Sequence, residues 1–267
     1  MTMHRNLAAG VALVAAAVML TAGCSSKVAG LPILADPASP KAAATTPSTT
    51  VSGGGGAGPV GELVDVSGKG VIRRSADGAR WAPSPEPGGL VSTPEAGCTL
   101  GAAVKRNGRS GFLIANHCVK SGAPQRVRIN AEAQNPLLIG TAVEGDPMTD
   151  SAVIWTEEAA GDSMIAGTWP VRGVLTVRQI DALADDTPIC MNTATSGVTC
   201  GGKSMGSRTV TTTAQVVPGD SGSAAFVVDS VGAAWLVGTV TDNPGGRSMI
   251  RAAAPTLERL GATAITA

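Results

Sequence analysis

One short segment of the sequence places a serine where it could act as a nucleophile. Residues 218–223 read PGDSGS, so Ser221 lies between Gly219 and Gly222. A serine hydroxyl attacks a carbonyl only if a base accepts its proton, and the charge that forms on the carbonyl oxygen needs backbone N–H groups directed at it. The two glycines allow the tight backbone path that such N–H groups require. Taken alone, GDSG could equally be a surface turn.

Two further segments supply a base and an acid that would complete this chemistry. Residues 112–118 read FLIANHC, so an apolar strand ends at His117, and residues 150–154 read DSAVI, so Asp150 opens a β run. Each is weak evidence alone, because a lone histidine at a strand end and an aspartate before a strand are both common. Together with Ser221 they predict a catalytic triad, in which a carboxylate orients the histidine and stabilises its protonated form.

The number of histidines identifies the base and limits other chemistry. The chain has only two, His4 and His117, and His4 lies in what reads as a targeting segment. A site built from several histidines is therefore excluded, and we expect no metal and no cofactor. Lys and Arg number 20, as do Asp and Glu, so charge gives no reason to expect a nucleic-acid partner.

The first residues have the composition of an export signal. Arg5 precedes an apolar stretch over residues 7–22, no acidic residue occurs before Asp36, and the stretch ends in small residues followed by Cys24. The stretch is short for a membrane span. This pattern resembles a bacterial lipoprotein signal, which predicts lipidation of Cys24 and anchoring to the outer face of the cytoplasmic membrane. The alternative is an ordinary signal peptide with an incidental cysteine, which would give a secreted protein.

The cysteine count agrees with a separate role for the first cysteine. Five cysteines are an odd number for an exported protein. Without Cys24 four remain, which can pair fully in an oxidising compartment. These are Cys98, Cys118, Cys190 and Cys200, and the count alone leaves three pairings open.

Composition divides the chain into four parts. Residues 1–23 form the signal, and residues 24–59, rich in Pro, Ser, Thr, Ala and Gly, form a disordered tether because they bury too little apolar surface to offset the entropy of ordering. Residues 60–95 are an extension of uncertain structure. Residues 96–267 have the pattern of an all-β domain, with short apolar runs between turn residues and one helix near the end. Among these runs, residues 171–177 are expected as a strand.

The motifs and the cysteine spacing together resemble those of one enzyme family. Residues 96–267 are similar to the small secreted bacterial members of the trypsin-like serine peptidases, the streptogrisin and α-lytic type. The order His, Asp, Ser, the motifs Ala-x-His-Cys and Gly-Asp-Ser-Gly, the CTLG segment that begins at Cys98 and the loop over residues 189–201 all match. The resemblance implies two six-stranded antiparallel β-barrels with a short C-terminal helix, and an active site between the barrels.

The same resemblance implies two disulfides and the roles of the triad. Ser221 would be the nucleophile, His117 the general base and then the general acid, and Asp150 the residue that orients the histidine. The disulfides would be Cys98–Cys118 and Cys190–Cys200.

The resemblance also implies how substrate is bound. The backbone N–H groups of Gly219 and Ser221 would form the oxyanion hole. Thr241, Asp242 and Asn243 fall where the family binds substrate backbone and builds one wall of the specificity pocket. The implied substrate is a protein or peptide, and we expect a monomer.

Four positions depart from the family pattern. Asn116 stands before the histidine where a small residue is usual, Ser223 stands where most relatives have a second glycine, and Asn243 stands where a glycine usually opens the pocket. The fourth is Met191, which stands where relatives of this type carry an arginine. In those relatives the arginine pairs with the aspartate before the nucleophile and props open the oxyanion hole.

Without that arginine, Asp220 would be a buried carboxylate without a cation, which is costly. Lys203 and Arg208 are the candidate substitutes, and the sequence has no Ile-Val-Gly site that would free an activating N-terminal amine. We expect a serine endopeptidase tethered outside the cytoplasmic membrane. The alternative, motivated by Met191 and Asn243, is a catalytically silent protease-fold lipoprotein that acts as a binding module in the cell envelope.

Overall fold

The computed structural model describes residues 58–70, 84–93, 96–119, 125–129, 137–242 and 244–267. All of them fall in one unit, Ser52–Ala267. The predicted signal, nearly all of the predicted tether, Cys24 and Asn243 lie outside the described residues. In the part of the chain that is described, no helix is both long enough and apolar enough to cross a membrane.

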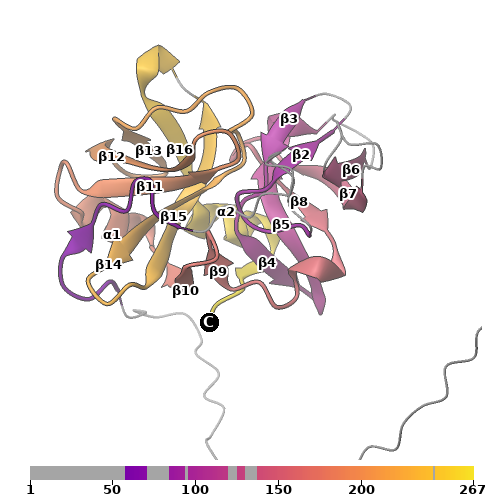
Figure 1. Cartoon of the computed structure of the whole chain (residues 1–267), viewed down its shortest axis with the longest axis horizontal. Helices are drawn as coiled ribbons and strands as arrows, with labels where there is room; N and C mark the ends of the chain where they lie inside the picture. The colour runs from indigo at the N-terminus through magenta and orange to yellow at the C-terminus, as the bar shows by residue number, and fades with distance from the viewer. Residues whose placement is uncertain (1–57, 71–83, 94–95, 120–124, 130–136, 243) are drawn as a thin grey trace, which may run out of the picture. The chain divides into compact units, whose positions relative to one another are not determined.

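The C-terminal half forms a closed ring of six antiparallel strands (Figure 1). The ring runs in the order β14-β11-β12-β13-β16-β15 and closes because β15 also pairs with β14. Its strands are β11 (Pro188–Thr193), β12 (Gly197–Met205), β13 (Thr209–Thr212), β14 (Ala224–Asp229), β15 (Ala234–Asp242) and β16 (Ser248–Ala252). Three strands extend it: β1 (Leu63–Val64) pairs with β14, while β10 (Trp169–Val174) runs parallel to β15 and carries β9 (Met164–Ile165).

The N-terminal half forms an eight-stranded antiparallel sheet in the order β17-β4-β5-β8-β7-β6-β2-β3. Its strands are β2 (Leu90–Ser92), β3 (Gly97–Thr99), β4 (Ala103–Arg106), β5 (Arg109–Ala115), β6 (Gln125–Ile129), β7 (Leu137–Asp146), β8 (Ser151–Trp155) and β17 (Thr263–Ala264). No strand pairing among the described residues closes this sheet into a ring. The predicted all-β, double-barrel class is confirmed. The C-terminal barrel has the six strands expected, whereas the N-terminal sheet has eight and stays open among the described residues.

Alternation along the strands divides the apolar residues among three cores. On β5, Phe112 and Ile114 point into the core of the N-terminal sheet, whereas Leu113 points the other way. Leu113 belongs to a cluster that also contains Phe226 of β14 and Leu236 of β15, so this cluster joins the two halves. A third cluster, with Ile189 and other aliphatic side chains, fills the C-terminal barrel. Aliphatic residues dominate all three, as the shortage of aromatic residues requires.

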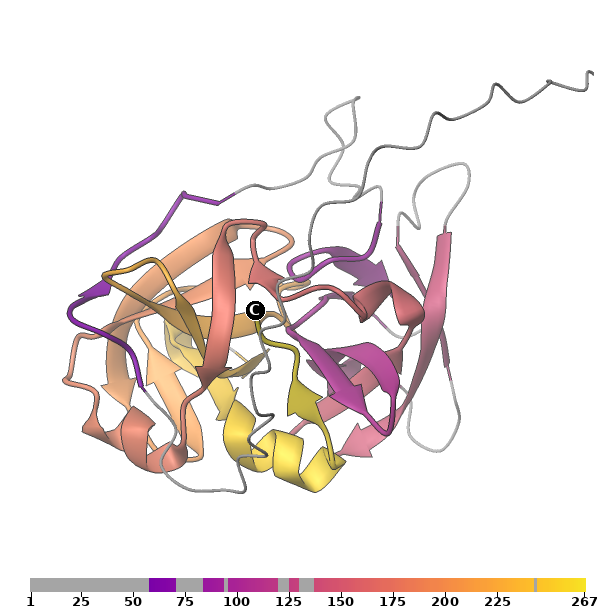
Figure 2. The same cartoon turned by 90° about the horizontal axis from the view of Figure 1, so that it is seen from below.

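The predicted C-terminal helix is present as α2 (Ala253–Leu260), which ends at Gly261 with a φ of 61°. It contacts β15 and β16 of one half and β7 of the other, and Figure 2 shows it at the junction between them. A second helix, α1 (Val177–Ala182), was not predicted, and the strand expected over residues 171–177 ends at Val174 instead. The cause is a capping box, in which Thr176 and Gln179 satisfy the first N–H groups of α1.

Residues 60–70, the described first part of the extension whose structure the sequence left open, run along the C-terminal barrel. The N–H of Val60 donates to Asp229 Oδ2 at 3.2 Å, and the N–H of Cys200 donates to Ser67 Oγ at 2.9 Å. Burial alone would raise the pKa of Asp229, but N–H groups that include Ala233 and Val60 donate to its carboxylate and hold the pKa below its usual value. This segment is therefore part of the folded unit.

Both disulfides implied by the family resemblance are present, Cys98–Cys118 and Cys190–Cys200. Replacing both Cys98 and Cys118 by alanine is expected to lower the free energy of unfolding by about 3 kcal/mol, because the bond constrains an unfolded-chain loop with a sequence separation of 20 residues. Urea unfolding monitored by tryptophan fluorescence would measure the change. An unchanged unfolding midpoint would contradict it.

Candidate active site

The structure brings His117 and Asp150 together in a hydrogen-bonded pair. His117 lies in a short 3₁₀ turn directly after β5, and Asp150 directly precedes β8. Nδ1 of His117 is 2.8 Å from Oδ2 of Asp150, and the backbone N–H of His117 donates to Oδ1 of the same carboxylate at 2.9 Å. Because Ala115 of β5 pairs with Ser151 of β8, the two strands hold these residues side by side. One carboxylate thus fixes both the ring and the backbone of the histidine.

The turn before Asp150 holds that residue in an uncommon backbone conformation. Its φ is 46°, in the left-handed region, which aspartate tolerates better than most residues but which persists only where the surroundings impose it. Asp146 anchors the turn by accepting the N–H of Met148 and the hydroxyl of Thr149, each at 3.0 Å. Arg259 of α2 donates to both oxygens of Asp146 and is the main cause of a pKa below the usual value for that carboxyl.

Asn116, the first departure from the family pattern, braces the same region. Its Oδ1 accepts the N–H of Gly145 in β7 at 3.0 Å, and its own N–H donates to the carbonyl of Asp150 at 3.0 Å. The asparagine side chain therefore ties a third strand to the turn that carries His117. An alanine at this position would leave the N–H of Gly145 without that acceptor.

Ser221 follows a tight turn that suits an oxyanion hole. The N–H of Asp220 donates to the carbonyl of Val217 at 3.0 Å, which makes Pro218 the second and Gly219 the third residue of a β-turn. Gly219 has a φ of 99°, and a positive φ at the third position is the requirement of a type II turn. Within the described residues, the N–H groups of Gly219 and Ser221 have no acceptor. Neither predicted donor is therefore used by another described group.

Gly222 packs residues 217–223, named here the nucleophile turn after the role predicted for Ser221, against β5, the strand that leads to His117. A Cβ at Gly222 would lie 2.4 Å from the carbonyl oxygen of Thr99 and 3.1 Å from the backbone nitrogen of Ala115, which is two residues before His117. The close approach brings Ser221 to the same end of β5. The Ser221 hydroxyl makes no hydrogen bond to any described residue, and in unliganded triads the contact with the base is often long.

Asp220 is fully buried, and no cation lies beside it among the described residues. Its carboxylate accepts the N–H of Val217 at 3.0 Å, the N–H of Thr195 at 3.2 Å and the hydroxyl of Ser196 at 3.4 Å. Met191, at the position where the family resemblance implies an arginine, is fully buried in the core of the C-terminal barrel. The carboxylate is therefore held by hydrogen bonds rather than by an ion pair.

The two basic residues considered as substitutes for that arginine lie elsewhere, so that expectation is wrong. The Lys203 ammonium group donates to the carbonyl of Leu183 at 2.6 Å, just beyond the C-terminal end of α1, where backbone carbonyls favour a cation. Arg208 lines a cavity of about 200 Å³ beside α2. Sequence order does not reveal that α1 offers Lys203 a set of carbonyls.

Two further residues contact the nucleophile turn, and sequence reasoning assigned a role to neither. Ser223, noted only as a departure, is buried and donates its hydroxyl to the carbonyl of Asp220 at 2.6 Å. Thr99 donates its N–H to the carbonyl of Ser221 at 2.8 Å and its hydroxyl to the carbonyl of Gly219 at 2.7 Å. The only sequence signal for Thr99 is its place directly after a half-cystine.

A cavity of about 460 Å³ opens beside the histidine. It is lined by His117, Asp150, Thr241, Asp242, Met249 and Arg251. Four of the predicted site residues therefore share one hollow. Thr241 donates its hydroxyl to the carbonyl of Met249 at 3.4 Å. Ser221 is not among the lining residues, and the predicted substrate contact Asn243 lies outside the described residues.

The surroundings of His117 favour its protonated form. The hydrogen bond that the His117 ring donates to the Asp150 carboxylate is the main cause of a pKa above the usual 6.5 for His117. Partial burial opposes the increase, and the negative charges of Asp150 and Asp242 add to it. Because the folded state raises this pKa, the pairing stabilises the fold fully below pH 6.5 and its contribution is lost as pH rises through the folded value.

Replacing Asp150 by asparagine is expected to lower the pKa of His117, because the substitution removes the main group that holds the proton on the ring. The measurement is an NMR titration, which is simple here because the chain has only one other histidine, His4. The matched control is Asp186→Asn, at the other aspartate with a positive φ among the described residues. A His117 pKa that is the same in wild type and Asp150→Asn would contradict the pairing.

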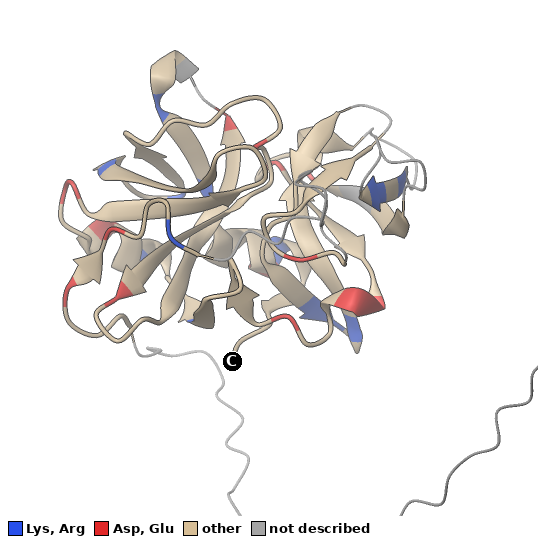
Figure 3. Ribbon diagram, in the orientation of Figure 1, with Lys and Arg blue, Asp and Glu red and all other residues tan. Residues whose placement is uncertain are grey.

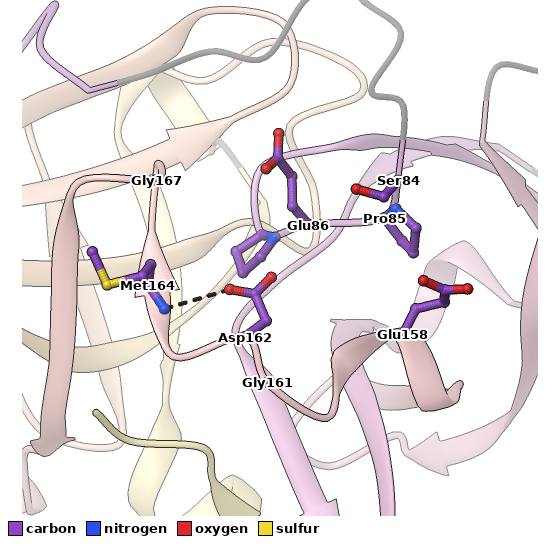
Figure 4. A pocket seen from close by; sticks show the side chains of 9 residues that line it. Ser84, Pro85, Glu86, Glu158, Gly161, Asp162, Met164 and Gly167 are labelled. Atoms are coloured by element: carbon purple, nitrogen blue, oxygen red, sulfur yellow. Dashed lines mark hydrogen bonds between the residues drawn. The ribbon is translucent and has the colours of Figure 1, made fainter. Parts of the chain in front are cut away.

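A separate hollow of about 330 Å³ is lined by residues 84–87 and by residues between Glu158 and Gly167 (Figure 4). Its lining includes the carboxylates Glu86, Glu158 and Asp162, and the N–H of Met164 donates to Asp162 Oδ1 at 3.4 Å. None of the predicted site residues lines it. Four predicted site residues, but not Ser221, line the hollow beside His117 instead.

The distribution of charged residues and of metal-ligand types can be followed in the part of the chain that the structure describes. Acidic and basic residues are interspersed over both halves in Figure 3. Among the described residues the one group with ligand types close enough to share an ion is Cys98, His117 and Cys118, and a disulfide joins its two sulfur atoms. Metal ligation by cysteine requires thiolates, which a disulfide does not provide.

No protein-family model and no curated protein matches the sequence. Solved structures match the fold. Protease A of Thermobifida fusca has a TM-score of 0.51 at 22% identity over 68% of this chain and 98% of its own. A glutamic-acid-specific serine protease has a TM-score of 0.52 and 20% identity, and the match covers 68% of this chain and 100% of that protease. A Nocardiopsis protease has a TM-score of 0.50 and 18% identity, and the match covers 68% of this chain and 98% of that protease.

Proposed function

Because the chain has the chymotrypsin-like fold of bacterial serine proteases, we propose that it is a serine endopeptidase that cleaves proteins or peptides through an acyl-enzyme. The observation that carries the proposal is the 2.8 Å contact between His117 Nδ1 and Asp150 Oδ2 at the edge of a cavity, with the glycine-flanked Ser221 packed at the end of the same strand. At 18–22% sequence identity, the matches to solved structures establish the fold alone, so the proposal of activity rests on this geometry.

In the proposed reaction, the Ser221 oxygen attacks the scissile carbonyl while His117 Nε2 accepts the hydroxyl proton. The imidazolium ion, stabilised by Asp150, then gives that proton to the leaving amine as the C–N bond breaks. A water molecule attacks the acyl-enzyme with the same base, which releases the acid and the free serine. The N–H groups of Gly219 and Ser221 would hold the oxyanion in both steps.

Substrate would lie along the end of β15. In the proposal, Thr241 and Asp242 offer backbone groups to the peptide; Asn243, the third predicted contact, lies outside the described residues. Asp242 lies close enough to His117 for its charge to contribute to the raised pKa of the ring. A position beside the base is where an extended substrate would pass.

We further propose that the protein works outside the cytoplasmic membrane, anchored through a lipidated Cys24 and a tether of polar and small residues. Two disulfides support an oxidising compartment. Mass spectrometry of the N-terminal peptide from the native membrane fraction would test the anchor. An unmodified N-terminus or a wholly soluble protein would contradict it.

Labelling of the full chain with a fluorophosphonate probe tests the proposed function. The wild type should be labelled and should cleave casein or members of a peptide library, whereas Ser221→Ala should do neither. Ser230→Ala, at a serine whose hydroxyl instead donates to the carbonyl of Val60 at 2.9 Å, is the matched control and should behave as wild type. Equal labelling of wild type and Ser221→Ala would overturn the assignment.

A silent binding lipoprotein is the alternative, and the missing cation at Asp220 is the observation that favours it. That alternative requires a collapsed oxyanion hole. The positive φ of Gly219 and the N–H groups of Gly219 and Ser221, which have no acceptor in the described structure, support a formed one. Absence of labelling in the wild type would favour the alternative.

A further inference from the structure

The nucleophile turn is held without the ion pair used by related proteins, so another group of residues must fix it. We propose that Thr99, acting with the tip of the β11–β12 hairpin (residues 194–196), is the positioning residue that holds the nucleophile turn in the conformation needed for an oxyanion hole. The inference rests on the proposed function for its kinetic consequences. Its structural consequence, the rigidity of residues 217–223, does not depend on catalysis.

Thr99 makes three hydrogen bonds that link separate parts of the site. It is fully buried, and its hydroxyl donates to the carbonyl of Gly219 at 2.7 Å while accepting the N–H of Ala194 at 3.2 Å. Its own N–H donates to the carbonyl of Ser221 at 2.8 Å. A hydroxyl can donate one bond and accept others, so a single side chain joins the nucleophile turn to the hairpin tip.

The hairpin tip holds the other side of the same turn. The N–H of Thr195 and the hydroxyl of Ser196 both contact the carboxylate of Asp220, at 3.2 and 3.4 Å. Consecutive residues of one tip thus bind Thr99 and Asp220. Hydrogen bonds to a buried carboxylate satisfy much of what an ion pair would otherwise supply.

These contacts restrict the peptide plane next to the oxyanion donor. The Gly219–Asp220 peptide is held at both ends, because Thr99 donates to its carbonyl and its N–H donates to the carbonyl of Val217. The preceding residue, Pro218, has a φ fixed by its ring. The N–H of Gly219 lies between these two restrained units, so loss of the Thr99 hydroxyl would free the turn to change conformation.

Replacing Thr99 by valine removes the hydroxyl and keeps the shape. We expect kcat to fall about 10- to 100-fold with KM within about threefold of wild type, a smaller loss than the 10²- to 10³-fold seen when an oxyanion donor itself is removed. Thr99→Ser keeps the hydroxyl and should restore most of kcat. The same pattern should appear in the rate of fluorophosphonate labelling.

The matched control is Thr256→Val, because Thr256 is equally buried and donates its hydroxyl to the carbonyl of Ala252 within α2. It should lose comparable stability without losing kcat. Hydrogen exchange of the peptide over residues 217–223 should be faster in Thr99→Val and unchanged in Thr256→Val.

The two readouts separate the inference from the proposed function. A wild type that is inert to substrates and probe would contradict the proposed function, and the exchange measurement would then decide the inference alone. Unchanged exchange over residues 217–223 in Thr99→Val would overturn the inference. So would a Thr99→Val enzyme whose loss is entirely in KM, or a Thr99→Ser enzyme as impaired as Thr99→Val.

Discussion

Replacing His117 by alanine is expected to lower kcat by about 10⁶-fold, because triad residues act as a unit and loss of the base leaves the serine hydroxyl unactivated. No other described residue can substitute, since His4 is the only other histidine in the chain. Residual turnover should come from the oxyanion hole and substrate binding. Initial rates on a peptide substrate, with fluorophosphonate labelling of the same samples, would measure the effect.

Asp150→Asn should reduce kcat by about 10⁴-fold, because an asparagine can neither stabilise the imidazolium ion nor select the correct tautomer. The variant should remain folded, since asparagine also tolerates the positive φ at this position. Asp186→Asn, at the other aspartate with positive φ in the described chain, should leave kcat at the wild-type value. A Asp150→Asn enzyme with wild-type kcat would mean that the 2.8 Å contact has no catalytic role.

Gly222→Ala should lower both stability and reactivity. Its φ of 94° is unfavourable for alanine, and the new Cβ would lie 2.4 Å from the Thr99 carbonyl oxygen, a main-chain atom that cannot rotate away. We expect a loss of about 2–6 kcal/mol in the free energy of unfolding, the sum of backbone strain and overpacking. Chemical denaturation would give this value, and probe labelling would report the displaced Ser221.

Gly232→Ala separates the two causes. Gly232 has a φ of 81°, and a Cβ there would meet nothing within 4 Å. It should show the backbone strain alone, about 1–3 kcal/mol, and full labelling. The close packing of the nucleophile turn on β3 and β5 would be contradicted if Gly222→Ala lost no more free energy of unfolding than Gly232→Ala and were labelled as fast as wild type.

Several parts of the fold and the site could be predicted because local sequence encodes them. A strand that ends at His117 and a β run that begins at Asp150 predict the base and the acid of a triad, and the structure places these two side chains in hydrogen-bond contact. The pattern of short apolar runs predicts an all-β domain, and the cysteine spacing shared with the family implies the pairs that form. These features depend on residue type and order alone.

Other features could not be predicted because they depend on contacts between distant segments. Thr99 and Gly219 are 120 residues apart in sequence, and nothing near Thr99 indicates that its hydroxyl reaches that carbonyl. Lys203 is a candidate partner of Asp220 by its charge, but in the structure its ammonium group donates to the carbonyl of Leu183 after α1. The apolar run before α1 is typical of a strand and extends to the first residue of the helix, so only the Thr176–Gln179 capping box indicates that a helix begins there.

The position of β17 sets the order in which the chain can reach its final form. This strand comes from the last residues of the sequence, yet it pairs with β4, so that Thr263 lies opposite Lys105. The β4 edge of the N-terminal sheet therefore cannot be covered until the whole C-terminal barrel, which precedes β17 in the sequence, has been synthesised. Pairings so distant in sequence slow folding. The two halves should fold as one cooperative unit, and a chain released part-way through synthesis should leave the edge of β4 open to aggregation.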